Sequence, residues 1–223
     1  RQALLKSKTQ FVNQLHALNY SEVSAKQVIR SLQQMIKKLE TQHAKIEKQI
    51  LELAKQDELF YKQVLQIVDS LKGIGIISLL SVLAETNGFK SFTSIRQLVS
   101  YAGLDIVENQ SGMRSGKTRI SKQGNARLRA ALFMPSMSLI RYKVEPFYSM
   151  YDRIRKRNGD IKMKALVAVQ RKLLVLLYTL WKNETTFIEG YYQVNDPDQR
   201  GSSEMNPELL EIDPVKTALL CDR

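Results

Sequence analysis

The chain has little of what most hydrolytic and zinc-dependent sites require. Its 223 residues include one cysteine, Cys221, and two histidines, His16 and His43. A single cysteine cannot form an internal disulfide or complete a zinc site, and it favours a reducing, cytoplasmic compartment. Both histidines fall in helical segments far from the basic segment defined below. No Ser-His-Asp or Cys-His arrangement is therefore expected.

Other motifs are missing as well. The chain has no Walker loop and no dinucleotide-binding fingerprint, and no cluster of carboxylates suits a two-metal nuclease. The longest apolar candidate, residues 165–181, is interrupted by Gln170, Arg171 and Lys172. A membrane-spanning helix needs about 20 apolar residues, so we expect no membrane span. We also expect no cofactor bound by this chain.

Positive charge is concentrated in residues 112–172, here called the basic segment. It contains sixteen Lys and Arg residues and three acids, a net charge of +13, whereas the rest of the chain has 18 against 19, or −1. Such clustering indicates that the segment binds a polyanion, because a surface that only aids solubility does not need its charge in one place. The commonest polyanion is nucleic acid, so we expect an association with the nucleoid. We expect DNA contacts from these members: Arg114, Lys117, Arg119, Lys122, Arg127, Arg129, Arg141, Lys164 and Arg171.

The hydrophobic spacing predicts an all-α protein with a coiled-coil arm followed by a compact helical domain. Residues 1–68 form the arm, 69–188 the domain, and 189–223 an acidic, proline-containing tail with a short helix near 215–220. From Ala25 to Ile67 apolar residues step by four and three, interrupted by His43 and Asp57, which we expect to set register or partner choice. The partner is residues 1–18 folded back, another subunit, or both; we expect a homo-oligomer.

Two glycines, Gly73 and Gly75, follow the arm in the outline of a helix-hairpin-helix. Their backbone N–H groups could hold a phosphate, although a plain glycine turn is the alternative. Further helices are predicted over 76–86, 93–101, 124–143, 146–157 and 161–182, with Thr93 capping the second. Between Gly103 and Gly124 we expect a loop or small hairpin.

The predicted helix over 124–143 places a serine among arginines. Helical spacing aligns Arg127, Ser138 and Arg141 on one face, and Pro135 should kink the helix. Such a serine could meet a phosphodiester whose charge the arginines neutralise. On spacing alone, a buried or capping serine is the simpler interpretation.

Several short motifs, taken in order, nevertheless resemble one family. They are residues 71–75 (LKGIG), 101–104 (YAGL), 110–112 (QSG), 120–125 (ISKQGN), 127–129 (RLR), 132–134 (LFM), 164–165 (KA) and 171–174 (RKLL). Over about residues 70 to 183 the chain resembles the C-terminal part of insertion-sequence transposases that join an N-terminal DEDD, RuvC-like domain to a C-terminal serine transposase domain. These are the bridge-RNA-guided recombinases.

The resemblance implies that Ser138 is the nucleophile that attacks a DNA phosphate, with Ser136 as the competing candidate. It also implies DNA and a guide RNA as partners, and Mg²⁺ bound by the RuvC-like domain. No segment here resembles that domain, so we expect this chain to bind DNA or RNA without cutting on its own. The alternatives are a non-catalytic helix-hairpin-helix module and a structural coiled-coil protein with incidental charge.

Overall fold

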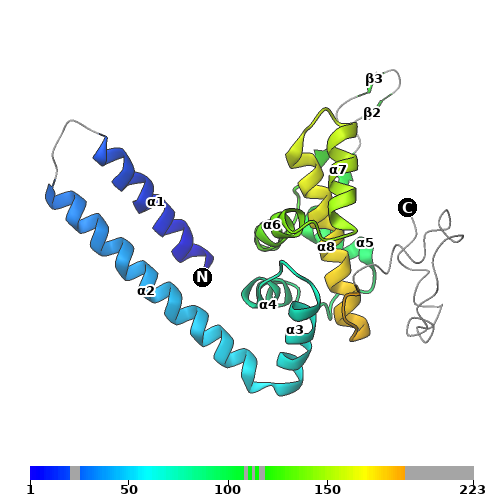
Figure 1. The fold of residues 1–223 in the computed structure, drawn as a ribbon, viewed down its shortest axis with the longest axis horizontal. Helices are drawn as coiled ribbons and strands as arrows, with labels where there is room; N and C mark the ends of the chain where they lie inside the picture. Colours follow the sequence, from blue (N-terminus) through cyan, green and yellow to red (C-terminus); the bar gives the residue numbers. More distant parts are fainter. Residues whose placement is uncertain (21–25, 108–109, 112–113, 116–118, 189–223) are drawn as a thin grey trace, which may run out of the picture.

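The described residues form an almost entirely helical structure. A computed structural model describes residues 1–20, 26–107, 110–111, 114–115 and 119–188 (Figure 1). Its helices are α1 (Gln2–Asn19), α2 (Lys26–Gln56), α3 (Glu58–Ser70), α4 (Ile76–Glu85), α5 (Ile95–Ala102), α6 (Ala126–Arg141), α7 (Phe147–Arg157) and α8 (Lys162–Asn183). The predicted all-α class is confirmed. The start of the expected seam at Ala25 and the whole 189–223 tail lie outside the described residues.

Helices α1 and α2 form an antiparallel hairpin that extends from the rest of the molecule (Figure 1). Arg1 Nε lies 2.8 Å from Glu47 Oε1, and Lys8 Nζ lies 2.9 Å from Glu40 Oε1. Residues 1–18 therefore fold back onto the apolar positions of α2, as one of the predicted alternatives required. Leu32 is buried there, and His43 is half-buried with its Nε2 3.7 Å from Glu47.

The predicted continuous seam to Ile67 is wrong at Asp57. The chain leaves helical geometry at this residue, and the Asp57 carboxylate accepts a hydrogen bond from the N–H of Phe60 at 3.0 Å. Aspartate is a strong N-cap because its oxygen satisfies a free N–H of the first turn. Asp57 thus starts α3 instead of setting a register. Downstream, Val64 and Ile67 enter the main core.

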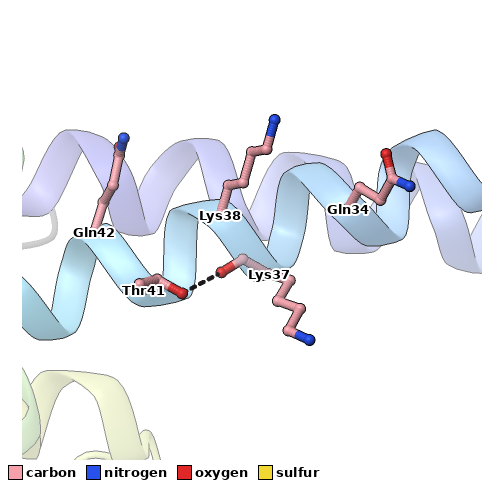
Figure 2. A pocket seen from close by; sticks show the side chains of 5 residues that line it. All are labelled: Gln34, Lys37, Lys38, Thr41 and Gln42. Carbon is pink, nitrogen blue, oxygen red and sulfur yellow. Dashed lines mark hydrogen bonds between the residues drawn. The ribbon is translucent and has the colours of Figure 1, made fainter.

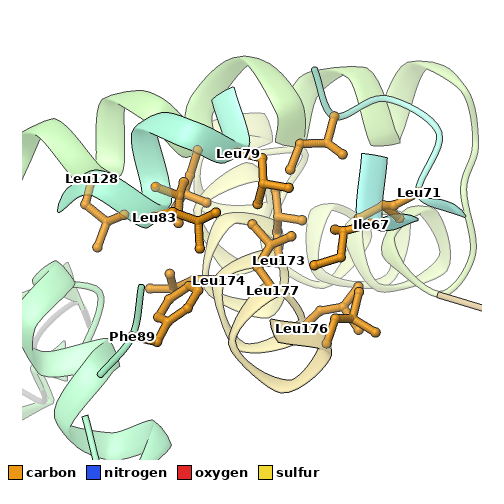
Figure 3. Close-up of a cluster of buried hydrophobic side chains, with 14 of the residues drawn as sticks. Ile67, Leu71, Leu79, Leu83, Phe89, Leu128, Leu173, Leu174, Leu176 and Leu177 are labelled. Carbon is orange, nitrogen blue, oxygen red and sulfur yellow. The ribbon is translucent and has the colours of Figure 1, made fainter. Parts of the chain in front are cut away.

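Helix α8 lies at the centre of the hydrophobic core. Its buried leucines Leu173, Leu174 and Leu177 pack among side chains of α3, α4 and α6 (Figure 3). Helices α5, α6 and α7 all contact α8 as well. Because several helices pack against α8, its buried residues form a broad band and not a narrow stripe, which explains the near-continuous hydrophobic run in its sequence. No helix in the described part of the chain is both long and apolar enough to span a bilayer.

The N-cap of helix α5 lies one residue later than predicted. Ser94, not Thr93, is its N-cap, and the Ser94 hydroxyl accepts a hydrogen bond from the N–H of Gln97 at 3.3 Å. The Thr93 hydroxyl instead donates to the Gln97 side chain at 3.0 Å. Both residues suit the position chemically, so the sequence did not distinguish them.

The segment between α5 and α6 contains short antiparallel pairs, in agreement with the predicted small hairpin. Strand β1 (Ile106–Val107) pairs with β4 (Arg119–Ile120), and β2 (Gln110–Ser111) pairs with β3 (Arg114–Ser115). At the base of this excursion, the N–H of Asn125 donates to the carbonyl of Tyr101 at 2.7 Å. The end of α5 and the start of α6 are therefore held together.

Gly124 lies at the tightest point of this junction. A Cβ at this position would lie 2.4 Å from the Tyr101 carbonyl oxygen and 2.6 Å from the Gly103 nitrogen, and its φ is +156°. Both obstacles are backbone atoms, so no side-chain rotation can relieve the clash. Only glycine fits here.

We expect Gly124→Ala to lower the free energy of unfolding by about 3 kcal/mol, since a methyl group forced into a packed site requires backbone movement. Urea denaturation followed by circular dichroism measures this loss. Gly75→Ala is the matched control, because nothing lies within 4 Å of a Cβ there. Its expected cost stays below about 1 kcal/mol. Equal stability of the two variants would contradict the close approach.

Candidate active site

Ser138 lies on the second half of α6, a helix that is fixed at its start by Asn125. The Asn125 Oδ1 accepts hydrogen bonds from the N–H groups of Arg127 at 2.9 Å and Leu128 at 3.1 Å. The helix continues through Pro135 to Arg141 and ends at Tyr142. Its buried side, which includes Leu128, Leu132 and Leu139, faces the core. Ser138 is half-buried at the edge of the opposite side.

The structure brings the predicted serine and the predicted glycine turn together. Gly73, with a φ of +110°, packs so closely on α6 that a Cβ there would lie 3.2 Å from the Leu139 nitrogen and 3.3 Å from Ser138 Cβ. Gly75 is exposed at the N-cap of α4. The turn that joins α3 to α4 therefore forms one wall beside Ser138. Sequence spacing gave no signal for this contact, which joins segments far apart in the chain.

Ser136 and Ser138 have different surroundings. Ser136 is fully buried, and its hydroxyl has no hydrogen-bond partner. Ser138 is partly open to solvent, and its hydroxyl makes no hydrogen bond to any described residue. Of the two candidate nucleophiles, Ser138 is the one that an outside reactant can approach without rearrangement of the helix.

The three arginines of α6 that were predicted to contact DNA differ in their surroundings. Arg127 has 74% of its side chain exposed, and its Nη1 lies 3.9 Å from Glu85 Oε1. Arg141 is exposed in the last turn. Arg129 is half-buried and donates to the Ala102 carbonyl at 2.8 Å, so it also fastens α6 to α5.

The other predicted DNA-binding residues are more widely distributed. Arg119 in β4, Lys122 before α6, and Lys164 and Arg171 on α8 are exposed. Lys164 Nζ donates to the Asn158 side chain at 2.6 Å. Arg114 belongs to β3, where only the backbone is described, and Lys117 lies outside the described residues.

Sequence reasoning missed a second cationic group beside Ser138. Lys72, in the glycine turn, holds its Nζ 5.2 Å from the centroid of the Tyr142 ring, one turn beyond Ser138 on α6. An ammonium over an aromatic face is attracted by the ring quadrupole. This contact adds a positive charge and an exposed ring to the surroundings of the serine.

The end of the molecule where α7 meets α8 carries more positive charge, part of it neutralised internally. Lys156 Nζ lies 2.6 Å from Asp152 Oδ2, and Arg155 Nε lies 3.2 Å from Asp160 Oδ1. The hydrogen bond from Lys156 lowers the pKa of Asp152. Burial lowers the pKa of Lys172 on α8; repulsion from Arg153 adds to that shift, and Glu145 opposes it. Arg155 and Lys156 therefore have internal partners in addition to any phosphate they meet.

Two other parts of the described structure lack the features of a binding site. A shallow groove on α2 is lined by polar side chains alone, namely Gln34, Lys37, Lys38, Thr41 and Gln42 (Figure 2). All five side chains come from one helix, so the groove brings together no polar groups from different elements. Across the described residues, no three His, Cys, Asp or Glu side chains come together as a metal-binding group.

A partly exposed polar network sets the direction of the Asn125 side chain. Its Nδ2 donates to Glu85 Oε2 at 2.8 Å and lies 3.1 Å from the Tyr101 hydroxyl. Tyr101 in turn donates to the Glu85 carbonyl at 3.1 Å. Because Glu85 holds the amide nitrogen of Asn125, the amide oxygen of Asn125 points at the N-terminus of α6. In the sequence, Tyr101 and Asn125 stood out only as members of the motifs 101–104 and 120–125, and nothing there linked them to each other.

The network makes Asn125→Asp a sensitive test. Aspartate caps helices as well as asparagine does, but here its second oxygen would face the Glu85 carboxylate. We expect the free energy of unfolding to fall by about 2 kcal/mol at neutral pH, which is the cost of an unpaired, partly buried charge. The folded variant should bind a proton between the two carboxylates, so its deficit shrinks as pH falls toward about 4.

Thermal unfolding at a series of pH values measures this effect. Glu85→Gln combined with Asn125→Asp is the control, because it restores a donor opposite an acceptor and should remove the pH-dependent deficit. A deficit of Asn125→Asp that does not change with pH would contradict the network.

Comparisons with known proteins find similarity over part of the chain. Residues 65–152 match the Transposase IS116/IS110/IS902 family. The chain is 31% identical over 131 residues to the pilin gene-inverting protein of Moraxella lacunata, covering 58% of this chain and 40% of that protein. It is 35% identical over 126 residues to a putative transposase, y4rJ, of Sinorhizobium fredii, covering 54% of this chain and 31% of that protein.

A third relative is the transposase for insertion sequence element IS1111A of Coxiella burnetii. It is 29% identical over 125 residues, which cover 55% of this chain and 34% of that protein. The matched part of the chain thus spans less than half of the length of these relatives. Through the turn at Gly73 and the helix that carries Ser138, the chain is similar to the transposases of the IS116/IS110/IS902 family.

Proposed function

We propose that this chain is the DNA-binding, serine-bearing part of an insertion-sequence transposase. The observation that carries the proposal is the setting of Ser138. Ser138 is half-buried, its hydroxyl has no described hydrogen-bond partner, and it lies on a helix with Arg127 and Arg141. The similarity to transposases and a pilin gene-inverting protein supports DNA as the substrate.

The proposed chemistry is transesterification at a DNA phosphate. The Ser138 oxygen attacks phosphorus, a serine–phosphate bond forms, and the bond to one sugar oxygen breaks. The serine proton is lost, and the departing sugar oxygen takes up a proton. The phosphoester is conserved, so a sugar hydroxyl of a new strand can reverse the step without ATP. Arg141, one turn from Ser138, stabilises the charge that develops on the phosphate, and Arg127, three turns away, contacts a neighbouring phosphate.

The described residues do not offer a ligand set for Mg²⁺. We assign the expected metal ion to a RuvC-like domain outside these residues, and no step above is routed through it. Base selection by pairing with a guide RNA belongs to the same proposal. It would leave the protein side chains to hold the phosphate backbone.

Self-association through the arm is also part of the proposal. Helix α1 has no buried residue, and Val12, Val28 and Met35 remain 41%, 49% and 45% exposed on the hairpin. A hairpin with such partly open apolar positions gains stability when a second copy covers them.

A non-catalytic helix-hairpin-helix module is the second candidate. The observation in its favour is Gly75, exposed at the start of α4 with open space around it, where backbone N–H groups could meet a phosphate. This candidate requires no role for the Ser138 hydroxyl.

Both candidates predict salt-dependent DNA binding. With roughly six phosphates neutralised, log K should fall against log salt with a slope of about −5. Fluorescence anisotropy with a labelled duplex measures this slope, and Arg141→Ala should reduce its magnitude by about 1. Lys48→Ala on the arm is the control. A slope near zero would favour the structural coiled-coil alternative.

Only the first candidate predicts a covalent intermediate. In a transposase that includes the RuvC-like domain, Ser138→Ala should abolish the protein–DNA adduct seen on a denaturing gel. Ser136→Ala should retain it, and should not lower stability, because it removes a buried hydroxyl without a partner. An adduct that survives Ser138→Ala would exclude Ser138 as the nucleophile.

A further inference from the structure

Ser138 lies between two larger side chains on one row of α6. Met134 is one turn before it and Tyr142 one turn after it, so the three residues follow the spacing of four that aligns side chains along a helix. Met134 is 63% exposed and Tyr142 is 53% exposed. Ser138 is therefore flanked on both sides by side chains that project further into solvent than it does.

The neighbouring row continues the same surface. Met137 is 46% exposed, and Arg141 follows it one turn later. Lys72 lies over the Tyr142 ring from the glycine turn. We call Met134, Met137 and Tyr142 the apolar rim of the serine. The helix itself contains no acidic residue, and two cations, Arg141 and Lys72, lie at the Tyr142 end of the rim.

A bound phosphate accounts for the positive charge near Ser138, but it does not account for the exposed apolar side chains of the rim. Large exposed apolar side chains beside a polar reactive group mark a surface that meets a partner. A partner with negative charge and flat apolar faces fits both features, and unstacked nucleotides have both. Methionine can enter between base steps as an apolar wedge, and an aromatic ring can stack on a base that has left the helix.

We propose that Met134 and Tyr142 hold bases that leave the duplex stack next to the phosphate at Ser138. The inference rests on the proposed function, because strand transfer requires the nucleotides beside the cut to leave their old partners. Tyr142 supplies a stacking platform that the Lys72 ammonium helps to fix. Met134 fills the space that an unstacked base leaves behind. Both act by positioning DNA, and the bond-making step stays with Ser138.

The test uses the 223-residue chain and two labelled DNA probes. One is a fully paired duplex, and the other is the same duplex with unpaired bases at its centre. Stacking of one base contributes about 1–3 kcal/mol, so the chain should bind the second probe about 5- to 150-fold more tightly. Anisotropy titrations at one fixed salt concentration give the ratio of the two dissociation constants.

The variants separate stacking from charge. Tyr142→Ala and Met134→Ala should each reduce this ratio at least threefold while affinity for the paired duplex changes less than twofold. Tyr142→Phe retains the ring and should retain the ratio. Tyr20→Ala and Leu53→Ala are matched controls, since Tyr20 is 80% and Leu53 is 63% exposed on the arm. Both should leave the ratio unchanged.

The outcomes distinguish this inference from the function on which it rests. If the chain binds neither probe, the proposed DNA-binding function fails and the inference fails with it. If it binds both probes equally, or if Tyr142→Ala and Met134→Ala keep the full preference, only the inference is overturned. If the control variants on the arm lose the preference for unpaired bases to the same extent, the inference is also overturned, because the preference would then not come from the rim.

Discussion

The position of helix α6 depends on two places where backbone approaches backbone without an intervening side chain. At its start, Gly124 lets the chain touch Tyr101 and Gly103, and in its second half Gly73 lets the turn before α4 lie against Leu139 and Ser138. A larger residue at either place would push α6 away. Ser138, Arg141 and Tyr142 are carried by the segment that these two contacts hold. The arrangement around the serine is therefore set by residues with no side chain of their own.

The net charge of the basic segment overstates the number of cations available for a ligand. Arg129 is used to hold the Ala102 carbonyl, and Arg155 and Lys156 pair with acids of their own region. Partly exposed pairs of this kind contribute little to stability, but they fix the direction of long side chains. Exposed cations such as Arg141 and Arg119 remain for phosphate contacts. Counting charges along the sequence predicted a class of partner, nucleic acid, but not which cations remain available to contact it.

Local periodicity predicted most of the helices because their buried faces repeat with the helix. The predicted 76–86 and 161–182 correspond closely to Ile76–Glu85 and Lys162–Asn183. The same reasoning failed at Asp57, where a residue that suits a helix start interrupted an otherwise regular apolar pattern. Pattern alone does not tell whether a polar residue is tolerated in a helix or begins a new one. That choice depends on how α3 packs into the core.

The candidate site was predictable only in part, for a related reason. Spacing along α6 placed Ser138 near arginines, yet it left a buried serine as the simpler interpretation, and the resemblance was needed to single it out. The contacts that define its surroundings, Gly73 with Ser138 and Lys72 with Tyr142, join distant segments. Glu85 and Tyr101, which orient the cap of α6, come from two further helices. No local pattern encodes such pairings.

Local helix stability is low just before the serine, which is why the distant contacts matter. Pro135 has no N–H to donate to the carbonyl one turn earlier, and Ser136 is buried with an unpaired hydroxyl. Both features weaken the helix between its cap and Ser138, because each leaves a polar group without its partner. The cap at Asn125 and the packing of Gly73 hold the helix on either side of this weak turn. Ser138, the proposed nucleophile, therefore owes its position to tertiary contacts, so substitutions at Glu85, Gly73 or Gly124 should displace it as effectively as changes within α6 itself.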